Sequence, residues 1–280
     1  MLSPTISLLR AATDGTYGLG AFNVYNLEGV RAVLAAAETN RSPVILQIHP
    51  SALKQGGAAL ISLCLMAAQE ASVPISVHLD HSRSKDEIRA ALQAGLTSIM
   101  ADGSHLPYDE NVDFTREMVS LVHEHGGTVE AELGRLTGTE DDVTVPEYEA
   151  NLTAPEQARG FIIETGADAL AICIGNVHGR YRGSPRLDLD RLAAIRAAVS
   201  VPLVLHGASG LGESLVRRSI ELGICKFNVN TEVRAAYLDA LREGLGTHST
   251  DLLDLLERAI DAMKDAVSAK LQLFGSISKA

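Results

Sequence analysis

Short apolar runs recur along the whole chain, and most of them are followed by a longer segment whose apolar residues repeat at helical spacing. Such runs predict buried strands, and the helical repeats predict amphipathic helices. The predicted strands are Leu19–Asn23, Pro43–Ile48, Pro74–Leu79, Thr97–Ala101, Thr128–Glu132, Asp168–Ile174, Pro202–His206 and Ile224–Val229. The predicted helices include Leu27–Thr39, Asp86–Ala94, Asn111–His123, Pro155–Thr165, Leu189–Val199 and Glu213–Leu222.

About eight β-then-α units in a chain of 280 residues predict one domain, residues 1–280, of the α/β class with the (β/α)8 TIM barrel fold. A doubly wound open sheet is the alternative. That fold usually has fewer strands and a glycine-rich turn after the first one, whereas the turn here reads AFNVYN. The segment Ser249–Phe274 also has helical spacing, and we expect a C-terminal helical extension that packs on the barrel or on a neighbouring subunit.

Composition limits the classes of partner. The formal net charge of -11 argues against nucleic acid or an anionic membrane surface as the main partner. The three cysteines, Cys64, Cys173 and Cys225, lack zinc-finger spacing and lie among apolar residues, which predicts buried thiols in a reducing compartment. We find neither a basic-then-apolar leader nor an apolar run that approaches membrane-spanning length, so we expect a soluble cytoplasmic protein.

Polar side chains gather where the predicted strands end, which is where TIM barrels place their reactive groups. These residues are Asn23, Gln47, Asp80, His81, Asp102, Glu132, His206 and Asn228. His81, His178 and His206 follow three different apolar runs. Three neutral imidazoles with an open fourth position form a typical catalytic zinc site, so the spacing predicts a metal centre.

The neighbours of these histidines have alternative readings. Asp80, beside His81, is a candidate proton carrier, although the pair could instead be a helix cap and a loop residue. We expect Asp102 to orient a histidine or to contact the metal in an alternative position. Lys226 has the strand parity of Asn228 and is predicted to point inward, which keeps a Schiff-base mechanism open.

Two further segments have the composition of substrate-binding loops. The loops after the last two predicted strands read HGASG and NVNTE, and such loops commonly bind phosphate in TIM barrels through backbone amides and a helix N-terminus. Gly179, Gly207 and Gly210 allow close backbone approach, and the Ser209 and Thr231 hydroxyls either donate to phosphate or cap helices. The polar segment after Glu132 contains Glu140, a carboxylate that could close over substrate and move a proton.

Seven motifs now stand in order along the chain: AFNVYN, VHLDH, MADGSHLPYDENV, VEAELGRLTGTEDD, GNVHGRY, LVLHGASG and KFNVNTE. This combination resembles the class II, metal-dependent ketose-bisphosphate aldolases, the family of fructose-bisphosphate and tagatose-bisphosphate aldolases. The similarity extends from about Gly18 to the closing FGSISKA. The family fold is a (β/α)8 barrel, which agrees with the count of strands made independently.

The resemblance implies a role for each matching residue. It implies zinc ligands at His81, His178 and His206, an acid/base aspartate at Asp80 and a loop carboxylate at Glu140. It implies an alternative metal position at Asp102 and Glu132, and substrate contact by Asn23. The phosphate-binding residues that it implies are Gly179, Gly207, Ala208, Ser209, Asn228, Val229, Asn230 and Thr231.

The resemblance also implies the reaction. We expect an aldehyde-lyase that reversibly cleaves a ketose 1,6-bisphosphate, with fructose favoured over tagatose, to dihydroxyacetone phosphate and glyceraldehyde 3-phosphate through a zinc-stabilised enediolate. Zn²⁺ is the expected cofactor, Co²⁺ or another divalent ion can replace it in vitro, and a monovalent cation near the phosphate loop is compatible. Family members are typically dimers or tetramers.

Other readings of the function remain open. One is aldol cleavage of another phosphorylated sugar or sugar acid, and another is a non-catalytic barrel that binds sugar phosphate. This chain also has His49 where relatives often have a small hydroxyl residue, and Thr137 where many have glycine, which could alter recognition of the second phosphate and stiffen the loop. Arg180, Arg182 and Lys279 are candidate cations for that phosphate.

Overall fold

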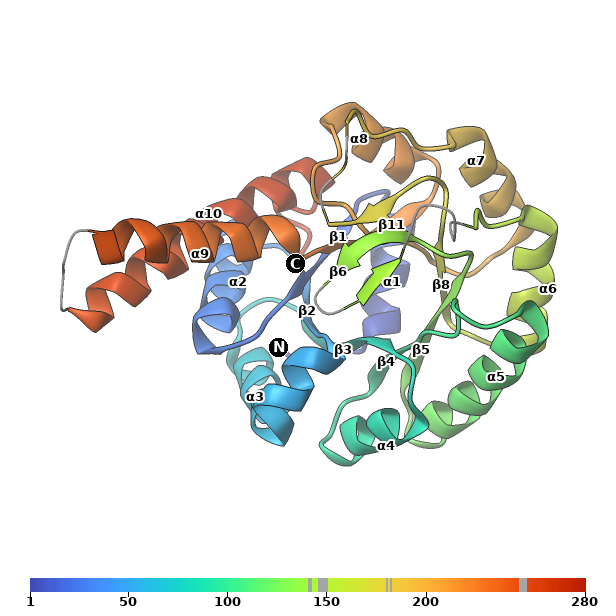
Figure 1. Cartoon of the computed structure of the whole chain (residues 1–280), viewed down its shortest axis with the longest axis horizontal. Coiled ribbons are helices and arrows are strands. Elements are labelled where there is room, and N and C mark those ends of the chain that lie inside the picture. The colour runs from blue at the N-terminus through green and yellow to red at the C-terminus, as the bar shows by residue number, and fades with distance from the viewer. Residues whose placement is uncertain (141–142, 146–150, 180, 182, 247–250) are drawn as a thin grey trace.

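Eight parallel strands close into a barrel in the computed structural model of the chain, and helices surround it (Figure 1). The structure describes residues 1–140, 143–145, 151–179, 181, 183–246 and 251–280; for residues 139, 140, 143 and 145 it describes the backbone alone. Around the barrel the strands follow the order β1-β11-β10-β8-β5-β4-β3-β2. Their bounds are Leu19–Asn23 (β1), Val44–Ile48 (β2), Ile75–Ser82 (β3), Ser98–Ala101 (β4), Thr128–Leu133 (β5), Ala169–Ile172 (β8), Leu203–Leu205 (β10) and Ile224–Val229 (β11).

The barrel confirms the predicted fold class, and the doubly wound open sheet is wrong. Each predicted strand coincides with an observed one, with ends that shift by up to three residues, as in β3, which continues to Ser82. The neighbouring strands pair in parallel all the way round; Ala21, for example, pairs with Ile45 on one side and with Asn228 on the other. The carboxyl ends of all eight strands therefore meet at one mouth of the barrel.

The helices form the outer layer of the barrel and a separate C-terminal hairpin. Their bounds are Thr5–Asp14 (α1), Leu27–Asn40 (α2), Pro50–Glu70 (α3), Lys85–Gln93 (α4), Tyr108–Glu124 (α5), Pro155–Thr165 (α6), Leu189–Ala198 (α7), Glu213–Glu221 (α8), Thr231–Gly246 (α9) and Leu252–Phe274 (α10). Local signals fix several of their ends. Asn26, Ser84 and Asp188 each accept a hydrogen bond from a backbone amide of the first turn that they cap.

Two apolar cores lie on the two sides of the strands. The larger one fills the space between the barrel and its helices, and it includes the buried side chains of Phe22, Val33 and Leu46. The smaller one fills the base of the barrel, where Leu8 and Leu9 of α1 pack with inward-facing residues such as Ala21. Helix α1 therefore closes the end of the barrel that is opposite to the mouth.

Helix α3 has the length and composition of a membrane span, with 21 residues and a mean hydropathy of 1.3 in its most apolar window. The expectation that no apolar run approaches that length is wrong for this helix by those two criteria. Packing on β2 and β3 accounts for part of this composition, since Leu60, Ile61 and Cys64 are buried in the outer core, although only 28% of that window is buried. Gly57 also interrupts it with non-helical backbone angles.

A small second sheet stands at the barrel mouth and was not predicted. Its strands are β6 (Thr137–Glu140), β7 (Val143–Val145) and β9 (Val177–His178), in the order β7-β6-β9. Strand β6 pairs with β9 in parallel, with Gly138 opposite His178. Thr137, expected to stiffen a loop, is instead the buried first residue of β6. The segment predicted as a polar loop therefore begins as a strand that supports His178.

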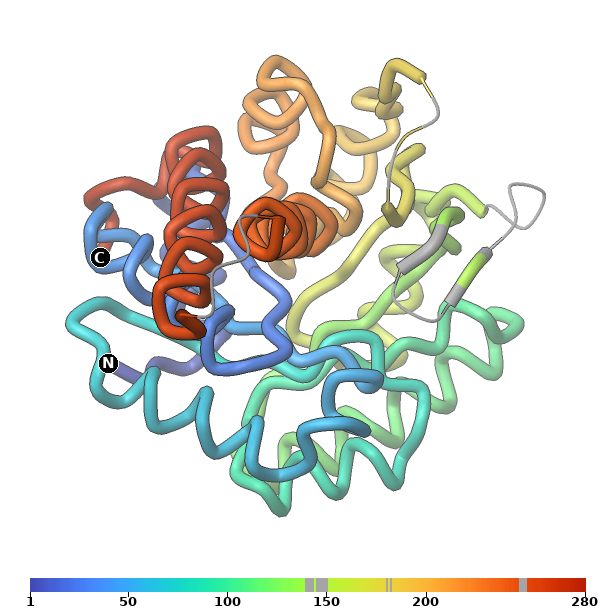
Figure 2. Tube along the Cα trace, turned by 60° about the vertical axis from the view of Figure 1, so that its left-hand side comes forward, coloured from blue at the N-terminus to red at the C-terminus, as the bar shows by residue number. Residues whose placement is uncertain are grey.

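The C-terminal extension is a pair of long helices, α9 and α10, which lie side by side outside the barrel wall (Figures 1 and 2). Helix α10 also packs along α2, and its Phe274 ring stacks on Phe227 of β11 with ring centroids 4.8 Å apart. The prediction of a C-terminal helix that packs on the barrel is confirmed, although the helix begins at Leu252, three residues later than expected.

Candidate active site

Asp80 and His81 share the end of β3, and an irregularity in the strand directs both toward the mouth. Successive side chains of a regular strand point to opposite faces. Here the pairing of β3 with β4 shifts register between Leu79 and Ser82, and His81 adopts a left-handed backbone conformation with φ of 42°. Such a conformation costs free energy for a non-glycine residue and is concentrated at functional sites. Asp80 is fully buried, and His81 is 8% exposed.

The three predicted histidine ligands come together from β3, β9 and the end of β10. One ring nitrogen from each lies within 4.8 Å of the other two. His81 Nε2 is 2.8 Å from His206 Nδ1, and the His81 ring centroid is 5.0 Å from that of His178. Two imidazole nitrogens at this distance can both bind one ion between them once the two rings move slightly apart.

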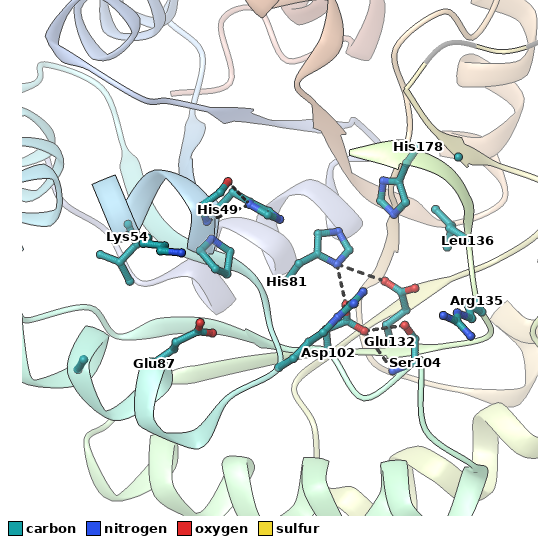
Figure 3. Close-up of a pocket in the computed structure, with 16 residues that line it drawn as sticks. His49, Lys54, His81, Glu87, Asp102, Ser104, Glu132, Arg135, Leu136 and His178 are labelled. Carbon is teal, nitrogen blue, oxygen red and sulfur yellow. Dashed lines mark hydrogen bonds and ion pairs between the residues drawn. The ribbon is translucent and has the colours of Figure 1, made fainter. Parts of the chain in front are cut away.

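Two buried carboxylates flank His81 (Figure 3). The His81 Nδ1 atom lies 3.1 Å from Asp102 Oδ2 and 3.9 Å from Glu132 Oε2. His81, Asp102 and Glu132 form a second group whose ligand atoms lie within 4.8 Å of one another. Imidazole and carboxylate donors are those that Zn²⁺ and similar ions prefer. The residues present therefore fit a divalent ion in either of two adjoining positions.

The electrostatics of the carboxylates differ. Burial and, after it, the nearby Asp102 charge raise the pKa of Glu132 to about 7. Burial also disfavours the charged form of Asp102, but its hydrogen bond and attraction to His81, together with Arg83, hold the pKa of Asp102 well below its usual value. Glu132 Oε2 is buried and has no hydrogen-bond partner. An ion beside it would supply the missing interaction.

Two side-chain amides donate hydrogen bonds to Asp80. Asn23 Nδ2 donates to Asp80 Oδ2 at 3.0 Å, and Asn228 Nδ2 donates to Asp80 Oδ1 at 3.2 Å. Gln47 Nε2 in turn donates to Asn23 Oδ1 at 3.2 Å. Asn23, predicted to contact substrate, therefore also orients the candidate proton carrier.

The two candidate phosphate loops lie side by side at the mouth. The Ala208 amide donates to the Asn228 carbonyl oxygen at 3.2 Å, which joins the loop after β10 to the end of β11. Ser209 Oγ is buried without a hydrogen-bond partner, and helix α9 begins at Thr231. Tyr25 donates to Asn230 Oδ1 at 2.9 Å, which orders the Val229–Asn230 turn. A helix N-terminus beside a partnerless hydroxyl is a suitable place for an anion.

Glycine is required in the loop after β10. Gly207 has φ of 65°, and a Cβ atom built on it would lie 2.0 Å from the Val177 carbonyl oxygen. Tyr181 donates to the Gly207 carbonyl oxygen at 3.0 Å, so this loop packs directly against β9. Gly179, which follows His178, also has a positive φ of 82°. The predicted loop residues after β9, β10 and β11 are thus brought together.

Several residues of the site were not found from the sequence. Glu130 accepts hydrogen bonds from His206 Nε2 at 2.8 Å and from Lys226 Nζ at 2.7 Å. Asn176 Nδ2 donates to the His206 carbonyl oxygen at 3.0 Å and ties the segment after β8 to β10. Strand parity predicted that Lys226 points inward, but nothing in the sequence pairs it with Glu130, a residue 96 positions away.

The Schiff-base alternative does not fit the surroundings of Lys226. Its predicted inward orientation is confirmed, but the side chain is fully buried and its ammonium pairs with Glu130. A lysine that attacks a carbonyl has to be neutral and to reach the substrate. Lys226 Nζ donates to Glu130 at 2.7 Å, and Lys226 does not line the cavity at the mouth.

A cavity of about 540 Å³ opens beside the histidines. Besides His81, His178 and the two flanking carboxylates, its wall includes three cations and His49 (Figure 3): Lys54, Arg83, Arg135 and His49. The His49 ring centroid is 6.3 Å from that of His81, and its Nδ1 accepts from the Ser51 amide at 3.2 Å. His49 therefore caps α3 and faces the same space as the histidine cluster.

The remaining candidates lie elsewhere. The side chain of Glu140 and the residues Arg180 and Arg182 are outside the described part of the chain. Lys279 lies over the Tyr17 ring, 5.7 Å from its centroid, and Tyr17 belongs to the base of the barrel. Lys279 therefore lies at the base of the barrel, remote from the cavity.

These features define an α/β barrel whose mouth carries clustered histidines, buried carboxylates and loops suited to an anion. Residues 3–279 match the family described as "Fructose-bisphosphate aldolase class-II". The chain belongs to this family, and it is an aldehyde-lyase. The recognition made from the sequence motifs is confirmed.

Individual relatives agree with this assignment. The chain is 43% identical to the fructose-bisphosphate aldolase of Thermus caldophilus over the full length of both. Among solved structures, the YdjI aldolase from Escherichia coli K12 superimposes with a TM-score of 0.91 at 37% identity, with full coverage of both chains. A candidate fructose-1,6-biphosphate aldolase from Coccidioides immitis gives a TM-score of 0.93 at 38% identity and covers 98% of this chain and 96% of its own.

Proposed function

We propose that this protein is a zinc-dependent aldolase that reversibly cleaves fructose 1,6-bisphosphate to dihydroxyacetone phosphate and glyceraldehyde 3-phosphate. The observation that carries the proposal is the convergence of His81, His178 and His206 within 4.8 Å, next to the buried carboxylate of Asp80. Membership of the class II family supports the reaction type, and the family is generally zinc-dependent.

The residues around Asp80 suit it to proton transfer in cleavage. We assign Asp80 the removal of the proton from the C4 hydroxyl as the C3–C4 bond breaks. The amides of Asn23 and Asn228, at 3.0 and 3.2 Å, hold the two carboxylate oxygens in fixed positions before substrate arrives. His81, His178 and His206 would hold a divalent ion, and such an ion would supply positive charge near the C2 carbonyl, where negative charge develops.

Glu140 is assigned the second proton transfer, protonation of C3, on the strength of the sequence motif TGTEDD alone. Its backbone belongs to β6, the strand that pairs with the His178 strand, so the residue follows the cavity-lining Gly138 by two positions. In this role Glu140 would enter the step as a neutral carboxylic acid, give its proton to C3 and be left as a carboxylate.

The two ends of the substrate meet different surroundings. We assign one phosphate to the loops that contain Gly179, Gly207–Ser209 and Asn228–Thr231, where the buried Ser209 hydroxyl has no partner. The other end of the substrate would extend into the cavity lined by Lys54, Arg83 and Arg135. These cations supply local positive charge in a protein whose net charge is -11.

The decisive experiment is a substrate panel on the zinc-loaded protein. We expect fructose 1,6-bisphosphate to be cleaved faster than tagatose 1,6-bisphosphate, with loss of activity in a chelator and recovery with Zn²⁺ or Co²⁺. Borohydride added with substrate should trap no adduct, because no imine forms. Affinity for dihydroxyacetone phosphate without turnover of any bisphosphate would instead identify a binding protein, and chelator-resistant activity would refute the metal centre.

We also propose that the protein acts in the cytoplasm as a homodimer or homotetramer. The hairpin of α9 and α10 supports assembly, since it exposes four large apolar side chains: Leu238, Leu245, Leu252 and Leu253. Sedimentation of the purified protein tests this proposal. A monomer at micromolar concentration would contradict it.

A further inference from the structure

A column of charged and polar side chains lies inside the barrel directly below the histidine cluster. It contains Glu130 of β5, Lys226 of β11, His78 of β3 and the His206 ring, and each is 2% exposed or less. The surrounding interior is apolar and includes Ala169, Ala171 and Val204. Removing two charges from water is unfavourable before their mutual attraction is counted, and a well-packed apolar interior often stabilises a fold equally well.

The two oxygens of Glu130 serve two different partners. Oε2 accepts from Lys226 Nζ at 2.7 Å, and Oε1 accepts from His206 Nε2 at 2.8 Å. The opposite ring nitrogen, His206 Nδ1, lies 2.8 Å from His81 Nε2. The imidazole of His206 therefore spans the distance between a buried carboxylate and the candidate metal position.

This arrangement decides which nitrogen of His206 carries the proton. An ionised carboxylate only accepts hydrogen bonds, so His206 Nε2 must be the donor and Nδ1 keeps its lone pair on the side of the metal. A carboxylate that accepts from the distal nitrogen of a ligand histidine fixes both the tautomer and the ring orientation. Lys226 neutralises the negative charge of the Glu130 carboxylate, which accepts this hydrogen bond.

We propose that Glu130 and Lys226 form a positioning pair that holds His206 in its metal-binding tautomer and orientation. Lys226 acts in this pair as a counter-ion and not as an amine nucleophile. The inference rests on the metal centre of the proposed function and adds two residues to it that touch neither substrate nor metal.

The test measures metal binding rather than turnover. In Glu130→Gln the side chain keeps its size but loses its charge, and we expect the Kd for Zn²⁺, measured by competition with a chromogenic chelator, to rise about 10- to 100-fold. The d–d absorption bands of the Co²⁺-loaded protein should change as well, because the histidine ligand is reoriented. This single variant leaves a buried ammonium without its partner and could fail to fold.

The double variant Glu130→Gln/Lys226→Met removes that difficulty because it removes both charges. We expect its Tm to recover relative to Glu130→Gln, while its Zn²⁺ affinity stays 10- to 100-fold below that of the wild type. Asp168→Asn is the matched control, since Asp168 pairs with His123 at the start of β8, remote from the mouth. Its Zn²⁺ affinity should equal that of the wild type.

The outcomes separate this inference from the proposed function. A wild-type protein that binds no Zn²⁺ would overturn both. If the wild type binds Zn²⁺ and the double variant binds it equally well with an unchanged Co²⁺ spectrum, the pair has only a structural role and the inference alone is overturned.

Discussion

Replacing Asp80 should impair catalysis and leave metal binding intact. Its carboxylate accepts hydrogen bonds from the amides of Asn23 and Asn228, whereas Glu130 is the carboxylate that orients His206. We expect Asp80→Ala to lower kcat by about 10²- to 10⁴-fold, the usual contribution of a positioned acid or base. The purified variant should fold and bind Zn²⁺, as circular dichroism and metal analysis would measure.

A carboxylate on the surface provides the control for that experiment. The side chain of Asp86 on α4 is 94% exposed, so Asp86→Ala should keep wild-type kcat. Near-normal turnover in Asp80→Ala would show that another group removes the C4 hydroxyl proton.

The raised pKa of Glu132 predicts a pH dependence of metal binding. Because its pKa is about 7, Glu132 in the metal-free protein holds a proton at pH 6, and a bound cation beside it should displace that proton. Calorimetry of Zn²⁺ binding in buffers of different ionisation enthalpy should therefore count about one more proton released by the wild type than by Glu132→Gln at pH 6. The difference should vanish by pH 8, where the carboxyl is already ionised.

The same shift has a consequence for the metal-free fold. A carboxyl group whose pKa is higher in the folded than in the unfolded state stabilises the fold at low pH, and this contribution is lost as the pH rises through the folded pKa of about 7.

Glu87→Gln is a matched control for the calorimetry of Zn²⁺ binding, because Glu87 lines the same cavity and is only partly buried. An equal proton count in Glu132→Gln and the wild type at pH 6 would refute the assignment.

Among the elements, the small sheet at the mouth is the one that the sequence does not predict. Strand β9 has two residues, too few for a period to be visible, and β6 reads Thr-Gly-Thr-Glu without an apolar alternation. The barrel strands are visible because both of their faces are buried, which makes them continuous apolar runs. The sequence therefore predicts that His178 belongs to the site, and only the structure shows which strand holds it there.

Gly138 is the point at which this small sheet can be disturbed. It has φ of 103°, and a Cβ atom would lie 2.1 Å from the His178 carbonyl oxygen. We expect Gly138→Ala to push β9 away from β6 and to weaken Zn²⁺ binding by displacing the His178 ring. Gly126→Ala tests the backbone cost alone, about 1–2 kcal/mol, since Gly126 also has a positive φ but no atom within 4 Å of its Cβ position.

The two glycine variants should differ in their effect on metal binding. Both variants should have a lower Tm, and only Gly138→Ala should lose Zn²⁺ affinity in the chelator competition. Equal affinity in the two variants would mean that the position of His178 does not depend on β6.

For the whole molecule, the sequence predicts most of the architecture. The eight strands and the C-terminal helix follow from hydrophobic periodicity, because most of the barrel strands are buried on both faces and therefore read as apolar runs. Loop motifs likewise predict which side chains meet at the mouth. The ion pair of Glu130 with Lys226 is beyond such reasoning, since it depends on the register in which β5 and β11 face each other across the barrel.

The C-terminal helix should be integral to the stability of the barrel. The Phe274 ring, 1% exposed, stacks on Phe227, and its carbonyl oxygen accepts from the Gly18 amide at 2.8 Å. We expect Phe274→Ala to destabilise the fold by about 3–5 kcal/mol, the usual loss for a buried phenylalanine, as a lower midpoint of urea unfolding would report. Ile163→Ala, at a position on α6 that is 71% exposed, should leave that midpoint unchanged.

Helix α1 limits the routes by which substrate can enter the barrel and products can leave it. Leu8, Leu9 and Ala12 pack across the base of the barrel, so in the described part of the chain side chains fill the interior beneath the histidines. Substrate and products therefore have to enter and leave through the cavity at the mouth. A compound bound in that cavity would block entry and release together, which makes the cavity a target for an inhibitor.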